Sequence, residues 1–212
     1  MDYSKQKTII EPKKGLSILN FRELYRFREL LWTLTYRDFR VKYAQTILGF
    51  VWAFINPIFT LVILSFVFGT VAKVDTGGVP HVIYTIAGMC GWTYFAKVFE
   101  QAGGSIIGAQ NMVKKIYFPR IIIPTSKAIT ALIDFVIVLL CLAILMIVYK
   151  FPPASTIIYM PLFIIVAIVS GLTAGIWMSA LTIRFRDFQH ITPLLVRVGM
   201  YATPIALSLI HI

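Results

Sequence analysis

Five long stretches with almost no charge dominate this sequence of 212 residues. Each of them holds at most one Asp, Glu, Lys or Arg, and they lie at 46–72, 76–96, 128–149, 151–183 and 188–212. About 20 apolar residues in a helix cross the roughly 30 Å hydrocarbon core of a bilayer. Backbone groups inside lipid must bond within their own segment, so these stretches should be helices. The sequence therefore predicts an all-α integral membrane protein.

The domain boundaries follow from the same pattern. We expect a flexible cytoplasmic tail at 1–15 and a transmembrane domain at 16–212. Within this domain an amphipathic helix is predicted at 17–40, followed by spans at about 46–72, 80–99, 125–149, 157–183 and 190–212. The run 206–212 has no helix cap or stop signal. Since the sequence ends where the fifth span should leave the membrane, we expect the domain to be C-terminally incomplete.

The positions of the basic residues predict the orientation. The net charge is +11, with ten Lys and Arg in 1–45, five in 97–127 and two in 184–187. The opposite side of the predicted spans carries only Lys73 and Lys150. By the positive-inside rule, the N-terminus is cytoplasmic. The positive charge is thus explained by membrane topology, and nucleic acid is not an expected partner.

The segment 17–40 has one apolar side, which includes Trp32, and one basic side. The basic side and its continuation carry Arg22, Arg26, Arg37 and Arg40. This pattern is typical of a helix that lies in the membrane interface with its arginines toward headgroups or a partner. The alternative is a cytoplasmic helix that packs on its own protein.

The segment between the second and third spans combines charge, aromatic rings and prolines. Gly103, Gly104 and Gly108 should loosen the preceding helix end, and a short helical turn is expected at 111–116. The residues that suit a docking surface are Asn111, Lys114, Lys115, Tyr117, Phe118, Pro119 and Arg120. The alternative is a positively charged loop whose aromatic residues anchor it at the interface.

Charged residues inside membrane spans are costly and often functional. Asp134 could make a structural hydrogen bond between helices, line a transport path, or pair with Arg197 in the fifth span. The aromatic residues of the second span could stack on sugar rings along such a path, or be ordinary membrane aromatics: Tyr84, Trp92, Tyr94 and Phe95.

The sequence offers no catalytic or metal-binding pattern. It lacks the Gly-Lys-Ser/Thr of a nucleotide-binding P-loop. Its three histidines are isolated, no two carboxylates are placed for acid–base catalysis, and Cys90 and Cys141 are expected as buried thiols. We therefore predict no cofactor in this chain. Any ATP-driven process would need a separate protein to bind ATP and Mg.

Four segments together resemble the ABC-2-type permeases, most closely the branch that exports O-antigen, capsule and teichoic acid. They are RVKYAQTILGFVWAFINP at 40–57, VKKIYFPR at 113–120, FRDF at 185–188 and YATP at 201–204. The resemblance implies six spans per subunit, a homodimer and a separate ABC ATPase. It also implies that the loop between spans two and three couples to that ATPase. A sixth span is expected but absent from this chain.

The resemblance predicts a permease subunit, not an enzyme, in the bacterial cytoplasmic membrane. Its substrate would be a lipid-linked polysaccharide, and its partners would be the ATPase, a second permease copy and membrane lipids. Within transport, the alternative is an ABC-2-type exporter of a lipid or a drug. A membrane-embedded enzyme or a passive scaffold would be different classes, and the sequence lacks the cluster of polar catalytic residues that an enzyme needs.

Overall fold

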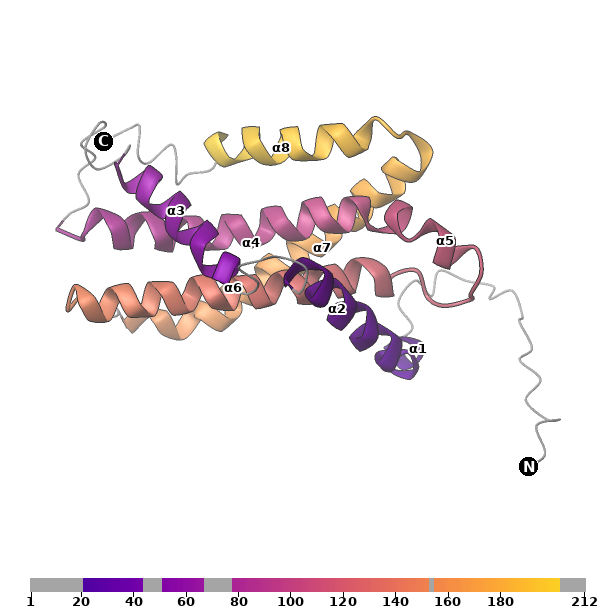
Figure 1. The fold of residues 1–212 in the computed structure, drawn as a ribbon, viewed down its shortest axis with the longest axis horizontal. Coiled ribbons are helices and arrows are strands. Elements are labelled where there is room, and N and C mark those ends of the chain that lie inside the picture. Colours follow the sequence, from indigo (N-terminus) through magenta and orange to yellow (C-terminus); the bar gives the residue numbers. More distant parts are fainter. Residues whose placement is uncertain (1–20, 44–50, 67–77, 153–154, 203–212) are drawn as a thin grey trace, which may run out of the picture.

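The computed structural model describes residues 21–43, 51–66, 78–152 and 155–202, and within these ranges the regular structure is helical (Figure 1). The helices are α1 Phe21–Arg26, α2 Arg28–Tyr43, α3 Trp52–Phe66, α4 His81–Gly108, α5 Gln110–Val113, α6 Ile122–Val148, the short 3₁₀-helix η3 Ser155–Tyr159, α7 Met160–Arg184 and α8 Phe188–Ala202. The all-helical prediction is confirmed.

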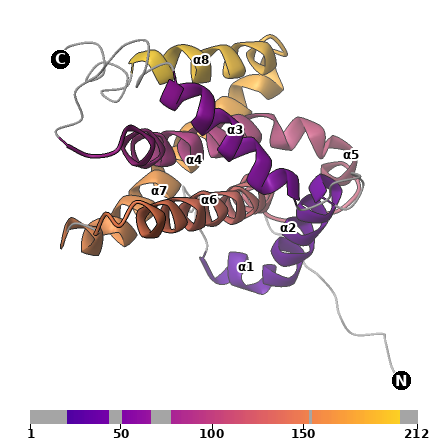
Figure 2. The same cartoon turned by 60° about the vertical axis from the view of Figure 1, so that its left-hand side comes forward.

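Helix α4 lies at the centre and packs against α7, α6, α8 and α3. Figures 1 and 2 show α6 running alongside α4, α3 crossing this pair obliquely, and α8 on the other side of α4. Helices α1, α2 and α5 lie together at one end of the bundle, which we call the α5 end. The connection between α7 and α8 lies at this end as well.

The core forms where α4 meets α6. Tyr94 and Val98 of α4 pack with Ala128, Ala131 and Phe135 of α6. The rings of Tyr94 and Phe135 are 5.0 Å apart between centroids, and the Tyr94 hydroxyl donates to the Ala128 carbonyl at 3.4 Å. A buried tyrosine hydroxyl requires such a partner, because leaving it unpaired in an apolar interior is costly.

Small residues allow α4 and α7 to approach closely. A Cβ atom added at Gly175 of α7 would lie 2.6 Å from the Cβ of Ala102, and one added at Gly171 would lie 3.1 Å from Val98. Small residues at helix contacts are typical of membrane bundles, where close van der Waals packing replaces the hydrophobic driving force. The α4–α7 contact thus depends on the absence of a side chain at these positions.

The described helices present long apolar faces to the outside. The segments Ile122–Val148 and Ile157–Arg184 are long and apolar enough to cross a membrane, and α3 is a shorter apolar helix. Phe163, Val166 and Trp177 of α7 are exposed. An exposed apolar surface of this extent fits burial in lipid. The number of five spans stays a prediction.

Two expectations about helix ends change. Helix α4 continues through Gly103 and Gly104 to Gly108, so these glycines do not end it. The predicted amphipathic helix is divided into α1 and α2 at Phe27.

Helix α6 begins at Ile122 with Pro124 in its first turn, where a missing backbone N–H costs nothing. The ends of the first span and the end of the fifth lie outside the described residues.

We predict that Gly175→Ala destabilises the bundle by about 1–3 kcal/mol, the usual cost of overpacking. The added methyl group would meet Ala102 on α4, and both backbones are fixed by their helices. The matched control is Gly91→Ala, where an added Cβ meets nothing within 4 Å and alanine favours the helix. Thermal unfolding in one detergent compares them, and an equal effect of both substitutions would contradict the packing argument.

Candidate functional site: buried charges between α2, α4 and α6

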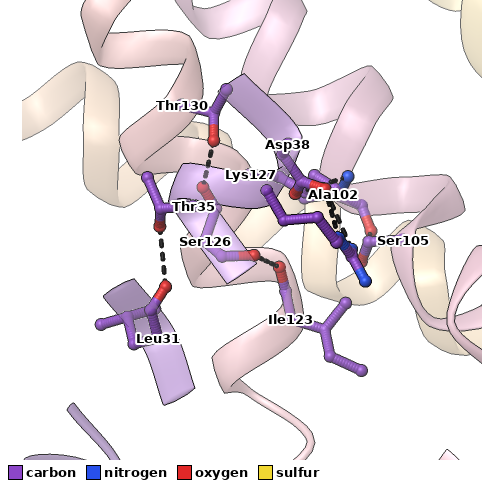
Figure 3. Close-up of polar contacts among 10 residues, drawn as sticks. Leu31, Thr35, Asp38, Ala102, Ser105, Ile123, Ser126, Lys127 and Thr130 are labelled. Carbon is purple, nitrogen blue, oxygen red and sulfur yellow. Dashed lines mark hydrogen bonds and ion pairs between the residues drawn. The ribbon is translucent and has the colours of Figure 1, made fainter. Parts of the chain in front are cut away.

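A first ion pair joins α2 to α6. The Lys127 ammonium lies 2.8 Å from Asp38 Oδ2, and Arg37 binds the other carboxylate oxygen at 2.9 Å (Figure 3). The Lys127 contact has ion-pair distance but not the angles of a hydrogen bond. The Asp38 side chain is only 11% exposed. A carboxylate in such a position needs cationic partners, and both helices supply one.

A second cluster forms around Asp134, further along α6. The Lys97 ammonium of α4 donates to Asp134 Oδ2 at 3.1 Å, and Lys42 of α2 pairs with the same oxygen. The Tyr43 hydroxyl donates to Oδ1. The Asp134 side chain is 8% exposed. Three helices therefore meet at one carboxylate, and both of its oxygens are satisfied.

The hydroxyl of Tyr43 is held in its protonated form. Burial, then the hydrogen bond to Asp134 and the charge of that carboxylate, raise the pKa of Tyr43 well above its ordinary value. Tyr43 therefore acts as a hydrogen-bond donor at any physiological pH. It completes the coordination of the carboxylate without adding a charge.

This cluster forms one wall of a cavity of 780 Å³ between α3, α4 and α6. Lys42, Lys97 and Asp134 line its polar side, whereas Leu61, Ile86 and Val138 line its apolar side. Within the described residues, no group of three or more His, Cys, Asp or Glu is placed to hold a metal ion. The chemistry of the site is thus that of paired charges in a partly apolar space.

The four aromatic residues that the sequence analysis proposed for a transport path differ in their surroundings. Tyr94 is 2% exposed in the α4–α6 core, which corrects that hypothesis for this residue. Trp92 packs on α8, where a Cβ atom at Gly199 would lie 2.7 Å from its ring. Phe95 stacks between Trp92 and Phe99 of α4. Tyr84 is half-buried on α4.

Arg197 is exposed on α8, and Asp134 is bound by Lys97 and Lys42 instead. The hypothesis of an Asp134–Arg197 pair is therefore wrong. Of the alternatives considered for Asp134, the geometry matches a bond between helices, because its partners lie on α2 and α4. The same residue also lines the cavity.

The segment after α5 divides into an exposed part and a buried part. Tyr117 is 67% exposed, and the neighbouring basic and polar side chains are exposed as well: Asn111, Lys114, Lys115 and Arg120. Phe118 is 6% exposed and packs with Leu34 of α2 and Ile122 of α6. Pro119 is half-buried beside it. Phe118 is thus an internal anchor, which corrects its prediction as a docking residue.

Helix α2 uses one face for its own protein and leaves others exposed. Leu34 and Thr35 are buried, whereas Trp32 is 69% exposed. Arg37 and Arg40 of α2 and Arg26 of α1 are exposed as well, and the side chain of Arg22 lies outside the described part. Helix α2 therefore packs on the bundle and also presents arginines and aromatic rings outward, and its position in the membrane interface stays a prediction.

The partners of Asp134 and the Asp38–Lys127 pair were not found by sequence reasoning. The available signal was depth: Asp134 lies about three turns into α6, in the interior of this apolar helix, and lysines occur on the neighbouring helices α2 and α4. A lone acid at that depth requires a cation from an adjacent helix end. The pairing itself depends on how the helices cross, which the sequence does not specify.

The fold and its charge clusters define a polytopic helical membrane protein. The sequence profile described as ABC-2 type transporter matches residues 29–212, and the chain belongs to this family. It is 28% identical to the O-antigen export system permease protein RfbA of Myxococcus xanthus over 184 residues, 87% of this chain and 70% of that protein. Two RfbA permeases of Klebsiella pneumoniae are 28% and 26% identical over 84% of this chain and 68% of their own lengths. The homologues are membrane subunits of transporters.

We predict that Phe118→Ala destabilises the protein by about 3–5 kcal/mol, because it leaves a cavity between α2 and α6. Its neighbour provides the control: Tyr117→Ala should change stability by no more than about 0.5 kcal/mol, since the ring is exposed. Thermal unfolding of the purified variants distinguishes the two positions. Similar losses at both positions would show that the burial difference is not real.

Proposed function

We propose that this chain is the permease subunit of an ATP-driven exporter that moves a lipid-linked polysaccharide across the bacterial cytoplasmic membrane. The observation that carries the proposal is the similarity to three O-antigen export permeases over most of the chain. None of these three relatives is named for export of a lipid or a drug, so that alternative is not favoured. Two copies of the chain would form the path for the polymer.

The motor would be a separate ABC ATPase, which binds ATP and Mg. The sequence has no P-loop of its own. The exposed surface after α5 supports a docking role, because it combines the Tyr117 ring with the charges of Lys114, Lys115 and Arg120 on one end of the bundle. Rigid aromatic rings and arginine are enriched at protein interfaces.

The α5 end would face the cytoplasm, with α2 at the membrane interface. The basic residues support this orientation, because Lys114, Lys115 and Arg184 belong to this end, whereas Lys150 follows the opposite end of α6. Exposed Trp32 and Tyr36 on α2 suit the headgroup region. The same orientation would place the proposed docking surface on the side where ATP is available.

We expect Tyr117→Ala to reduce export of surface polysaccharide at least tenfold while the permease inserts and folds normally. The reason is that the exposed ring would contact the ATPase and not the bundle. The measurement is surface polysaccharide and lipid-linked glycan inside cells of the source bacterium. The matched control is Tyr159→Ala, a tyrosine 58% exposed directly before α7, at the opposite end of that helix from its connection to α8. Normal export by the Tyr117 variant would refute the docking role. Loss of export without internal lipid-linked glycan would refute the substrate.

The orientation predicts which cysteines react from outside. In a background with Cys90→Ala and Cys141→Ala, we expect Lys150→Cys to react with an impermeant maleimide in intact cells. Lys114→Cys should react only after the cells are opened. Both positions are exposed, so protection reports the membrane and not the fold. Labelling of position 114 from outside would reverse the topology.

A further inference from the structure

The two ion pairs between α2 and α6 have opposite polarity. At the first, α2 supplies the acid and α6 the base, Asp38 to Lys127. At the second, α2 supplies the base and α6 the acid, Lys42 to Asp134. Asp38 and Lys42 are one helical turn apart and Lys127 and Asp134 two turns apart, so each pair lies on one helix face. We call these four residues the alternating seam.

Alternation of sign makes the contact specific for one alignment. If α2 slid along α6 in one direction, Lys42 would approach Lys127. In the other direction, Asp38 would approach Asp134. Both movements bring like charges together and remove a partner from a carboxylate that is nearly buried. Buried ion pairs often add little net stability, and their best-attested use is to select one register over others.

We infer that the alternating seam sets the register of α2 on α6, and that this register positions the exposed segment after α5, Lys114–Arg120. The segment rests on the same two helices, since Phe118 packs with Leu34 of α2 and Ile122 of α6. A shift of α2 would therefore move the buried contacts of Phe118 and displace the adjacent Tyr117. The link to coupling rests on the proposed function, whereas the register itself does not.

The other charged groups that face the seam leave this argument intact. Arg37 binds Asp38, and Lys97 of α4 binds Asp134. Each carboxylate therefore has two cationic partners. Asp38 binds Arg37 of its own helix and Lys127 of α6. Asp134 binds Lys42 of α2 and Lys97 of α4. Lys97 adds a third helix to the second cluster and ties the register of α2 to α4. These residues are positioning residues, because they act through the alignment of helices and not on a substrate.

The test compares two double variants at the same positions. Asp38→Lys with Lys127→Asp keeps each pair attractive but makes α2 uniformly basic and α6 uniformly acidic, so a slipped alignment also becomes attractive. Asp38→Glu with Lys127→Arg keeps the alternation. A purely stabilising role predicts the same structure for both. The register role predicts one alignment for the second variant and more than one for the first.

Spin labels at Trp32→Cys and Leu140→Cys, both exposed positions, report the alignment by pulsed electron resonance. The purified permease is used without native cysteines and is diluted with unlabelled protein. We expect the conservative variant to give one narrow distance. The reversed variant should add a population displaced by about 5 Å, one helical pitch, at unchanged thermal stability.

A single native distance in the reversed variant would overturn the inference. If that variant does not fold, a variant with Asp38→Asn, Lys42→Gln, Lys127→Gln and Asp134→Asn replaces it, since it removes all four charges of the seam without creating like-charge contacts within it. One narrow native distance there would again overturn the register role. The measurement contains neither ATPase nor substrate. Lost export in a variant that keeps the native distance therefore challenges the proposed function alone. If the distance measurements show the expected dependence of the register on the seam, the inference stands whatever the substrate is.

Discussion

The carboxylate of Asp134 is the interaction on which the meeting of α2, α4 and α6 depends. It lies in the more apolar of the two described segments that are long enough to cross a membrane, where an unpaired charge would be very costly. Lys97 brings α4 to it, and Lys42 with Tyr43 brings the end of α2. A single acid thus fixes where three helices meet. Without it, Lys42 and Lys97 would face each other in a partly apolar cavity, and the Asp38–Lys127 pair would be the remaining ion pair between α2 and α6 in the described residues.

The apolar contacts at the α5 end extend what the charges begin. Leu34 of α2, Phe118 and Ile122 form a buried cluster that continues from the ion pairs toward α5. Phe118 therefore connects the loop surface to the same two helices that carry the charges. Tyr117 directly precedes Phe118 in the chain, and its ring is exposed where that of Phe118 is buried. The exposed ring of Tyr117 is thus held next to an internal anchor.

Much of the fold could be predicted from apolar run length, because lipid allows little besides helices. The short helical turn expected near 111–116 is close to the observed Gln110–Val113. The site was harder to predict. Adjacent aromatic residues such as Tyr117 and Phe118 have the same composition signal but opposite burial, which only the packing of α2 decides. Likewise, an acid in a span predicts a cationic partner, yet Lys97 and Arg197 are equally plausible partners of Asp134 until the positions of the helices are known.

The bundle uses two kinds of contact with different stiffness. At α4–α7, glycine and alanine backbones approach so closely that even one methyl group has no room, and a sliding motion would meet the same obstacle at every turn. At α2–α6, long lysine side chains hold the carboxylates, and such flexible stems can follow small movements without losing the pair. Close packing therefore resists sliding of α4 against α7. The charged contacts fix which alignment α2 adopts, while the flexible lysine side chains allow α2 small movements within that alignment.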